Sequence, residues 1–122
     1  MTPTEFIAAV VAERRHQDQK FPDCADLPDS TDNAWARETF ERIARNACDR
    51  AYREGRCTFA HILDEETAEV LTAAAEGDVA SLEVELVQVA AVCLRWLEAI
   101  ARRETAGPRS SAENRKNEAA RP

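Results

Sequence analysis

The chain has 122 residues, which is enough for one domain with a single helical core. Its formal net charge of −7 disfavours nucleic acid and anionic membranes as partners, and it shows neither a signal peptide nor a long apolar run. The cysteines lack zinc-site or disulfide spacing, so we expect reduced thiols in a cytoplasmic protein, with Cys48 and Cys93 packed in the core.

The first predicted helix begins after Thr2 and runs to about Lys20. Thr2 is a good N-cap, Pro3 suits the first helical position, and Glu5 stands where a capping-box glutamate is expected. Lys20 lies in a polar cluster at the far end of this helix. The simpler interpretation of that cluster is a solvated helix end, and the alternative is contact with a polyphosphate.

A loop is predicted from Phe21 to Thr31, because this stretch contains two prolines and several acidic residues. The second helix is predicted from near Asp32 to about Glu54, with Gly55 as its stop signal. A core role is expected for its large apolar residues, with stacking on a flat ligand as the alternative for Trp35. The expected buried residues are Trp35, Phe40, Ile43, Ala47 and Ala51.

The third predicted helix follows the N-cap Thr58 and carries carboxylates on its apolar face. At roughly 100° per residue, Glu66 and Glu69 fall inside or beside the apolar arc, whereas Asp64 points away. Glutamates taken into a core without partners would be costly or would become neutral, and a divalent cation is the natural compensation. His61 is expected to be a structural hydrogen-bond partner, with metal ligation as the alternative.

Gly77 and Asp78 predict a helix stop followed by an N-cap, so the next helix should fold back as an antiparallel hairpin. That fourth helix is predicted from Leu82 to about Glu104, with Glu85 at the edge of its apolar arc. We therefore expect Glu85 to face Glu66 and Glu69. A second apolar strip should bury against another helix or another subunit, and it consists of Val84, Val87, Ala91 and Leu94.

These carboxylates resemble the signature of the MazG-like all-α nucleoside triphosphate pyrophosphohydrolases, which is Glu-Glu-x-x-Glu on one helix and Glu-x-x-Asp on the next. The first half matches as Glu65-Glu66-Thr67-Ala68-Glu69, and the second reads Glu85-Leu86-Val87-Gln88, with glutamine in the aspartate position. The resemblance covers most of Thr4 to Arg103 and is strongest to a phage and actinobacterial subset. It implies an all-α, four-helix bundle-like, MazG-type domain that forms homodimers or homotetramers.

The resemblance also implies a hydrolase that uses Mg²⁺, or Mn²⁺, to convert a (deoxy)nucleoside triphosphate to the monophosphate and pyrophosphate. The implied metal ligands are Glu66, Glu69, Glu85 and, more weakly, Gln88, whose amide oxygen brings no charge. Glu65 and Glu66 are the implied catalytic residues, with Glu65 as general base or as a positioning group outside the ligand set. Candidate substrate contacts are Lys20, Trp35 and Arg95.

Two other interpretations of the carboxylates stay open. They could form a Glu–Arg network that joins the two helices, with Arg95 or an arginine of the first helix as partner. Alternatively, the glutamine at position 88 could mark a relative that has lost catalysis and serves as a nucleotide-binding or interaction protein.

The C-terminal segment from Thr105 has no aromatic or large aliphatic side chain and cannot bury enough surface to order itself. Its net charge of +2 leaves −9 for the residues before it. The sequence therefore predicts one helical domain over residues 1–104 and a disordered tail over residues 105–122.

Overall fold

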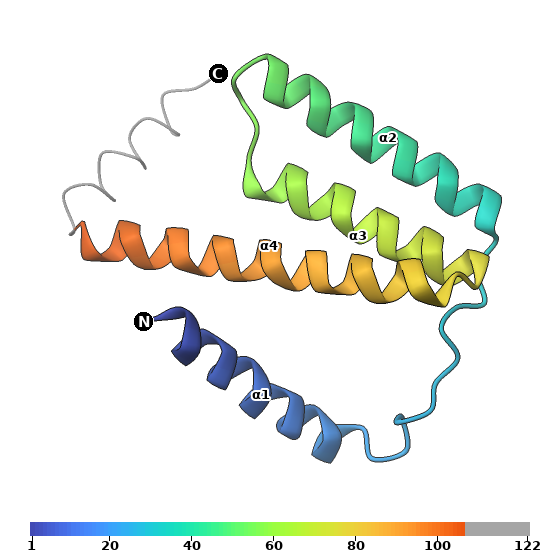
Figure 1. The fold of residues 1–122 in the computed structure, drawn as a ribbon, viewed down its shortest axis with the longest axis horizontal. Coiled ribbons are helices and arrows are strands. Elements are labelled where there is room, and N and C mark those ends of the chain that lie inside the picture. The colour runs from blue at the N-terminus through green and yellow to red at the C-terminus, as the bar shows by residue number, and fades with distance from the viewer. Residues whose placement is uncertain (107–122) are drawn as a thin grey trace.

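The computed structural model describes residues 1–106, which contain four α-helices and no strand (Figure 1). The helices are α1 (Pro3–Lys20), α2 (Ala34–Arg53), α3 (Phe59–Glu76) and α4 (Val79–Thr105), so the all-α prediction is confirmed for this part of the chain. None of these helices combines the length and the apolar character needed to cross a membrane. The predicted tail lies outside the described residues, except for Thr105 and Ala106, which end α4.

The helix ends lie close to the predicted ones, except that α4 begins at Val79, directly after the predicted N-cap Asp78 and three residues before the expected start at Leu82. At the start of α1, the Glu5 N–H donates to Thr2 Oγ1 and the Thr2 N–H donates to Glu5 Oε2, each over 3.2 Å. Gly77 ends α3 in the left-handed region with φ 71°, and Asp78 Oδ1 accepts from the Ser81 N–H at 3.1 Å to cap α4. These caps satisfy backbone groups that a helix end leaves unpaired, and they define the turn between α3 and α4.

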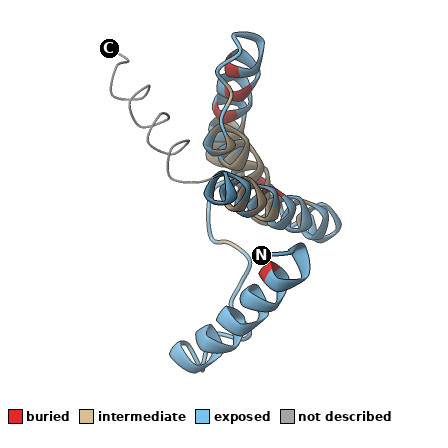
Figure 2. Ribbon diagram, turned by 90° about the vertical axis from the view of Figure 1, so that its left-hand side faces the viewer, coloured by how far each residue is buried: buried red, intermediate tan, exposed pale blue. Residues whose placement is uncertain are grey.

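The helices pack in the spatial order α2, α3, α4, α1. Within residues 1–106, α3 contacts both α2 and α4, whereas α1 contacts α4 alone. The α3–α4 pair is the predicted antiparallel hairpin, and α1 diverges from α4 toward its own C-terminal end (Figures 1 and 2). The arrangement is therefore an open, bundle-like one in which α3 is the central helix.

The face of α2 that packs against α3 differs from the predicted one. Its buried residues are Ala44, Cys48 and Ala51, of which only Ala51 was predicted. The rest of the predicted spine is wrong, since Trp35 is 72% exposed and Phe40, Ile43 and Ala47 are also exposed. The small residues allow the backbones of α2 and α3 to approach closely, and among the described helices α2 contacts no second one that would cover its bulky face.

Part of the predicted second strip on α4 is likewise uncovered within the described residues. Val87 is 69% exposed, and Val84 and Ala91 are exposed as well, whereas Leu94 is half-buried. On α1 only Phe6 is buried. Large apolar residues thus stay open to solvent on all four helices around this thin core, although α3 contributes only Leu71, which is 37% exposed.

Candidate metal centre

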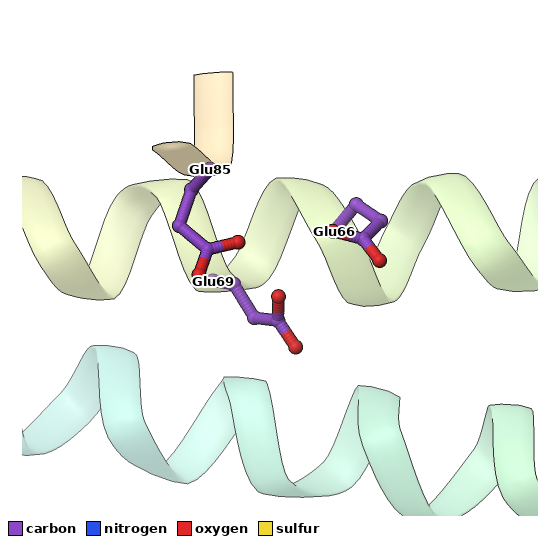
Figure 3. A group of neighbouring side chains, drawn as sticks. All are labelled: Glu66, Glu69 and Glu85. Atoms are coloured by element: carbon purple, nitrogen blue, oxygen red, sulfur yellow. The ribbon is translucent and has the colours of Figure 1, made fainter. Parts of the chain in front are cut away.

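Three glutamates from the two arms of the hairpin converge as predicted (Figure 3). Glu66 and Glu69 lie one turn apart on α3, and Glu85 reaches them from α4. One carboxylate oxygen from each residue can be chosen so that all three atoms lie within 4.8 Å of one another, and all three residues are half-buried. The i, i+3 spacing aligns the first two, and the capped turn brings the third opposite them.

Two of these carboxyl groups, Glu66 and Glu69, hold their protons more tightly than an exposed glutamate, because both are partly buried beside other carboxyl groups. Burial, followed by contact with Glu85 within hydrogen-bonding reach, raises the pKa of Glu69 to about 8. Burial and the charge of Glu85 also raise the pKa of Glu66. Without a cation, Glu69 therefore retains its proton near neutral pH, because burial and the neighbouring carboxyl groups both disfavour its charged form.

Gln88 lies one turn beyond Glu85 and contacts the same group. In the amide orientation that satisfies both ends of its side chain, the nitrogen donates to Glu85 Oε2 at 2.9 Å and to Glu66 Oε2 at 3.0 Å. An ionised aspartate at this position could only accept hydrogen bonds and would repel both carboxylates. The glutamine thus replaces a fourth negative charge with two donated hydrogen bonds.

The arginine that acts on this group comes from α2. Arg45 pairs with Glu41 at 2.6 Å, which raises its pKa, and the charges of Glu69 and Glu65 raise it further. Among the ion pairs within residues 1–106, none joins an arginine to Glu66, Glu69 or Glu85. The Glu–Arg network with Arg95 or an α1 arginine is therefore not formed there, and the carboxylates keep an excess of negative charge.

An acidic groove runs from this group between α2, α3 and the start of α4. Its volume is about 430 Å³, and its acidic lining consists of Glu38, Glu41, Glu69, Glu76, Asp78 and Glu85. The Thr72 hydroxyl beside it is buried without a hydrogen-bond partner within the described chain. The groove gives Glu69 and Glu85 access to solvent, so a cation could enter without unfolding the hairpin.

Glu65 turns toward α2 and is not among the converging glutamates. Burial, and then a hydrogen bond to Glu65, raises the pKa of the Cys48 thiol to about 12. This contact joins the Glu65 carboxylate to α2, while its charge still acts on Glu66 and Glu69. Glu65 therefore lies outside the group that could hold a metal, which is compatible with either predicted role, general base or positioning group.

Two of the cysteines meet although their sequence spacing did not suggest it. Cys57 lies within hydrogen-bonding reach of Cys48, and both thiols are free. Cys48 is buried as predicted, whereas the core prediction for Cys93 is wrong, because Cys93 is exposed on α4. Only the packing of α2 on α3 could have indicated the first contact.

His61 has the structural role that was expected. Its Nδ1 lies 2.7 Å from Thr58 Oγ1 and accepts from the Thr58 N–H at 3.1 Å, while the His61 N–H donates to Thr58 Oγ1. These bonds form a capping box at the start of α3. In the described chain the group that could hold a metal contains glutamates alone, which gives no support to His61 as a ligand.

The three candidate substrate contacts are spread over the molecule. Lys20 lies over the Phe21 ring, 5.3 Å from its centroid, on a helix that contacts neither α2 nor α3. Trp35 is in the first turn of α2. Arg95 is exposed on α4 and, seven residues beyond Gln88, points to nearly the same side of the helix. Of the three, Arg95 shares a helix face with the cluster.

Comparison with family models, with curated proteins and with solved structures finds no match to this chain. The candidate site is thus defined by its own geometry, which is three half-buried carboxylates from two helices beside an acidic groove. Carboxylate oxygens are the ligands that Mg²⁺ and Mn²⁺ prefer. The donor set therefore fits a hard divalent cation.

The raised pKa of Glu69 predicts how the stability of metal-free protein depends on pH. Its folded pKa is about 8, whereas an unfolded glutamate titrates near 4.3. Between these values the folded state binds the extra proton, so stability should fall as pH rises from about 5 to about 8. Thermal unfolding in EDTA would measure this, and Glu69→Gln should flatten the profile. Parallel profiles for the two proteins would contradict the assignment.

Gln88→Asp should lower the stability of the metal-free protein against unfolding and tighten its binding of a divalent cation. The change removes two hydrogen bonds, worth about 1 kcal/mol at this exposed position, and adds a charged ligand beside Glu66 and Glu85. Melting temperatures with EDTA, Mg²⁺ and Mn²⁺ would measure both effects, since a cation that binds only the folded state raises the melting temperature. Gln88→Asn is the matched control without added charge. An equal Mn²⁺-dependent shift in both variants would place residue 88 outside the ligand set.

Proposed function

We propose that this protein is a Mg²⁺-dependent nucleotide pyrophosphohydrolase of the MazG-like type. It would cleave a (deoxy)nucleoside triphosphate between the α and β phosphates to give a monophosphate and pyrophosphate. The observation that carries the proposal is the convergence of Glu66, Glu69 and Glu85 within 4.8 Å from the two arms of one hairpin. That convergence follows the motif spacing that resembles this family.

In this reaction, each residue of the site would have a distinct role. Mg²⁺, when bound, would neutralise phosphate oxygens and lower the pKa of an attacking water. Glu66, Glu69 and Glu85 would hold the cation as ionised carboxylates, so binding would release the proton that the group retains near neutral pH. Gln88 would steady Glu66 and Glu85 through its amide. Glu65, which contacts the Cys48 thiol, would act outside the ligand set, as general base or as a positioning group.

The alternative function is a cytoplasmic nucleotide-binding or interaction protein that has lost catalysis. The Gln88 amide favours it, because this chain then has one carboxylate fewer than the resembled motif, which places an aspartate at that position. Such a protein would still bind a metal–nucleotide complex through Glu66, Glu69 and Glu85. It would differ from the enzyme in releasing no pyrophosphate.

We also propose that the protomer assembles into a homodimer or homotetramer. Monomeric proteins rarely leave large contiguous apolar patches open. Here, the large side chains left exposed on the described helices include Ile7, Val10, Val11, Phe40, Ile43, Val84 and Val87. A second copy of the chain would supply cover for α1, the bulky face of α2 and the second strip of α4.

Hydrolysis should depend on Glu66 and on a divalent cation. Wild-type protein should release pyrophosphate from at least one member of a nucleoside triphosphate panel, and EDTA should abolish this activity. Glu66→Gln should lower it by more than about 100-fold, beyond the loss typical of residues that only surround a ligand. Glu83→Gln, an exposed glutamate on α4, is the matched control. Nucleotide binding without pyrophosphate release would support the alternative function.

Assembly should depend on the exposed strip of α4. Val87→Glu would force a charge into an apolar contact and should shift the protein from oligomer to monomer in sedimentation velocity. Val87→Thr, which is similar in shape, should have a smaller effect. Leu94→Glu is a poorer test, because Leu94 is half-buried within the protomer. A wild-type protein that is monomeric at micromolar concentration would contradict the proposed assembly.

A further inference from the structure

A second cavity lies where the C-terminal end of α4 extends past the start of α3. Its volume is about 660 Å³, and its wall is mostly apolar. The residues that give it chemical character are Phe59 from α3 and Trp96, Arg102 and Arg103 from α4. The acidic groove is formed at the opposite end of the hairpin, around the start of α4.

The aromatic part of this cavity is a preformed flat wall. The rings of Phe59 and Trp96 stack with centroids 5.7 Å apart and planes 13° apart. Both residues are half-buried and line the cavity, so the stack joins α3 to α4 and also borders open space. Aromatic faces of this kind bind other flat rings by stacking, as in proteins that hold nucleobases.

The polar part of the cavity consists of two guanidinium groups. Arg102 and Arg103 are exposed, and neither takes part in an ion pair within the described residues. A guanidinium offers hydrogen-bond donors only. The cavity therefore combines a stacking surface with donors that suit a ring edge rich in acceptors.

The helical register places this cavity on the same side of α4 as the metal cluster. Gln88, Arg95 and Arg102 are seven residues apart, so successive side chains drift by only about 20° around the helix. Along the axes, Phe59 lies about 10 Å from Glu66 on α3, and Trp96 about 16 Å from Glu85 on α4, at 1.5 Å per residue. The ribose and triphosphate of one nucleotide can bridge such a span, with Arg95 between its two ends.

We propose that this cavity binds the base of the nucleotide whose phosphates lie at the glutamates, and that it selects bases with keto groups. The ring stacks beside Phe59 and Trp96, and Arg102 and Arg103 donate to its acceptors. Guanine presents O6 and N7, and uracil and thymine present O4, whereas adenine and cytosine place an amino group on the corresponding edge. This inference rests on the proposed function and adds its substrate class.

The chain has two tryptophans, which allows a direct test of where the base binds. Trp35 lies in the first turn of α2, at the other end of the hairpin from the cavity (Figure 1). In Trp35→Phe protein, Trp96 is the sole tryptophan. With Mg²⁺ present, α,β-imido analogues of GTP and dUTP should quench its fluorescence at lower concentrations than those of ATP and dCTP. Inorganic tripolyphosphate should not quench it.

Two variants test the cavity through kinetics. Arg102→Ala should raise KM for the preferred nucleotide by about tenfold or more, as expected for loss of a bidentate base contact, with little change in kcat. Phe59→Leu should raise KM as well and keep the site apolar. Arg15→Ala on α1 is the matched arginine control. Because Arg102 is exposed, its variant should fold even if Phe59→Leu does not.

Several outcomes would overturn the inference and leave the proposed function intact. One is quenching by tripolyphosphate as strong as by nucleotides, which would make the cavity an anion site. Others are equal response to keto and amino bases, or an Arg102→Ala enzyme with unchanged KM. Conversely, base-selective quenching of Trp96 in Trp35→Phe protein, combined with wild-type protein that releases no pyrophosphate, would support the cavity and contradict the hydrolase.

Discussion

Repulsion among Glu66, Glu69 and Glu85 is the constraint on which the rest of this structure depends. Three carboxylates within 4.8 Å, half-buried between two helices, oppose the packing that brings them together. The hairpin nevertheless holds them, because the Gly77–Asp78 turn is capped on both sides and α3 is covered by α2 as well as α4. The stability of the apolar contacts offsets a local electrostatic cost, which is the usual arrangement at a functional site.

Three groups within the chain partly offset the repulsion among these carboxylates. The group retains a proton at Glu69, the Gln88 amide donates to two carboxylates, and Arg45 acts from α2 while paired with Glu41. A proton can leave, an amide can rotate, and the arginine is already engaged, so each of these can yield to a divalent cation. The acidic groove beside the cluster would raise the local concentration of cations. Glutamine at position 88 lowers the electrostatic cost of bringing the carboxylates together and at the same time lowers the negative charge offered to a cation.

The length of α4 connects the carboxylate cluster to the cavity at the other end of the hairpin. This helix extends from the acidic end of the hairpin to a cavity with aromatic and guanidinium walls, and Arg95 lies between them on the same side. A nucleotide also has two chemically different ends. Its anionic phosphates need a cation, and its flat base needs a stacking partner. The open faces of α1, α2 and α4 add a further requirement, because a second protomer would complete the cover of the thin core and could border the same site.

The sequence by itself determined the helices, their caps and the meeting of three glutamates. Capping residues such as Thr2, Thr58 and Gly77 act through bonds to their own neighbours, and a short turn leaves an antiparallel hairpin little freedom of register. Only the tertiary structure decided which face of α2 packs, that Glu65 meets Cys48, and that Gln88 donates to the cluster. Periodicity shows where the faces of a helix lie, but the choice among them depends on which partner offers the closer fit, and that partner is distant in sequence.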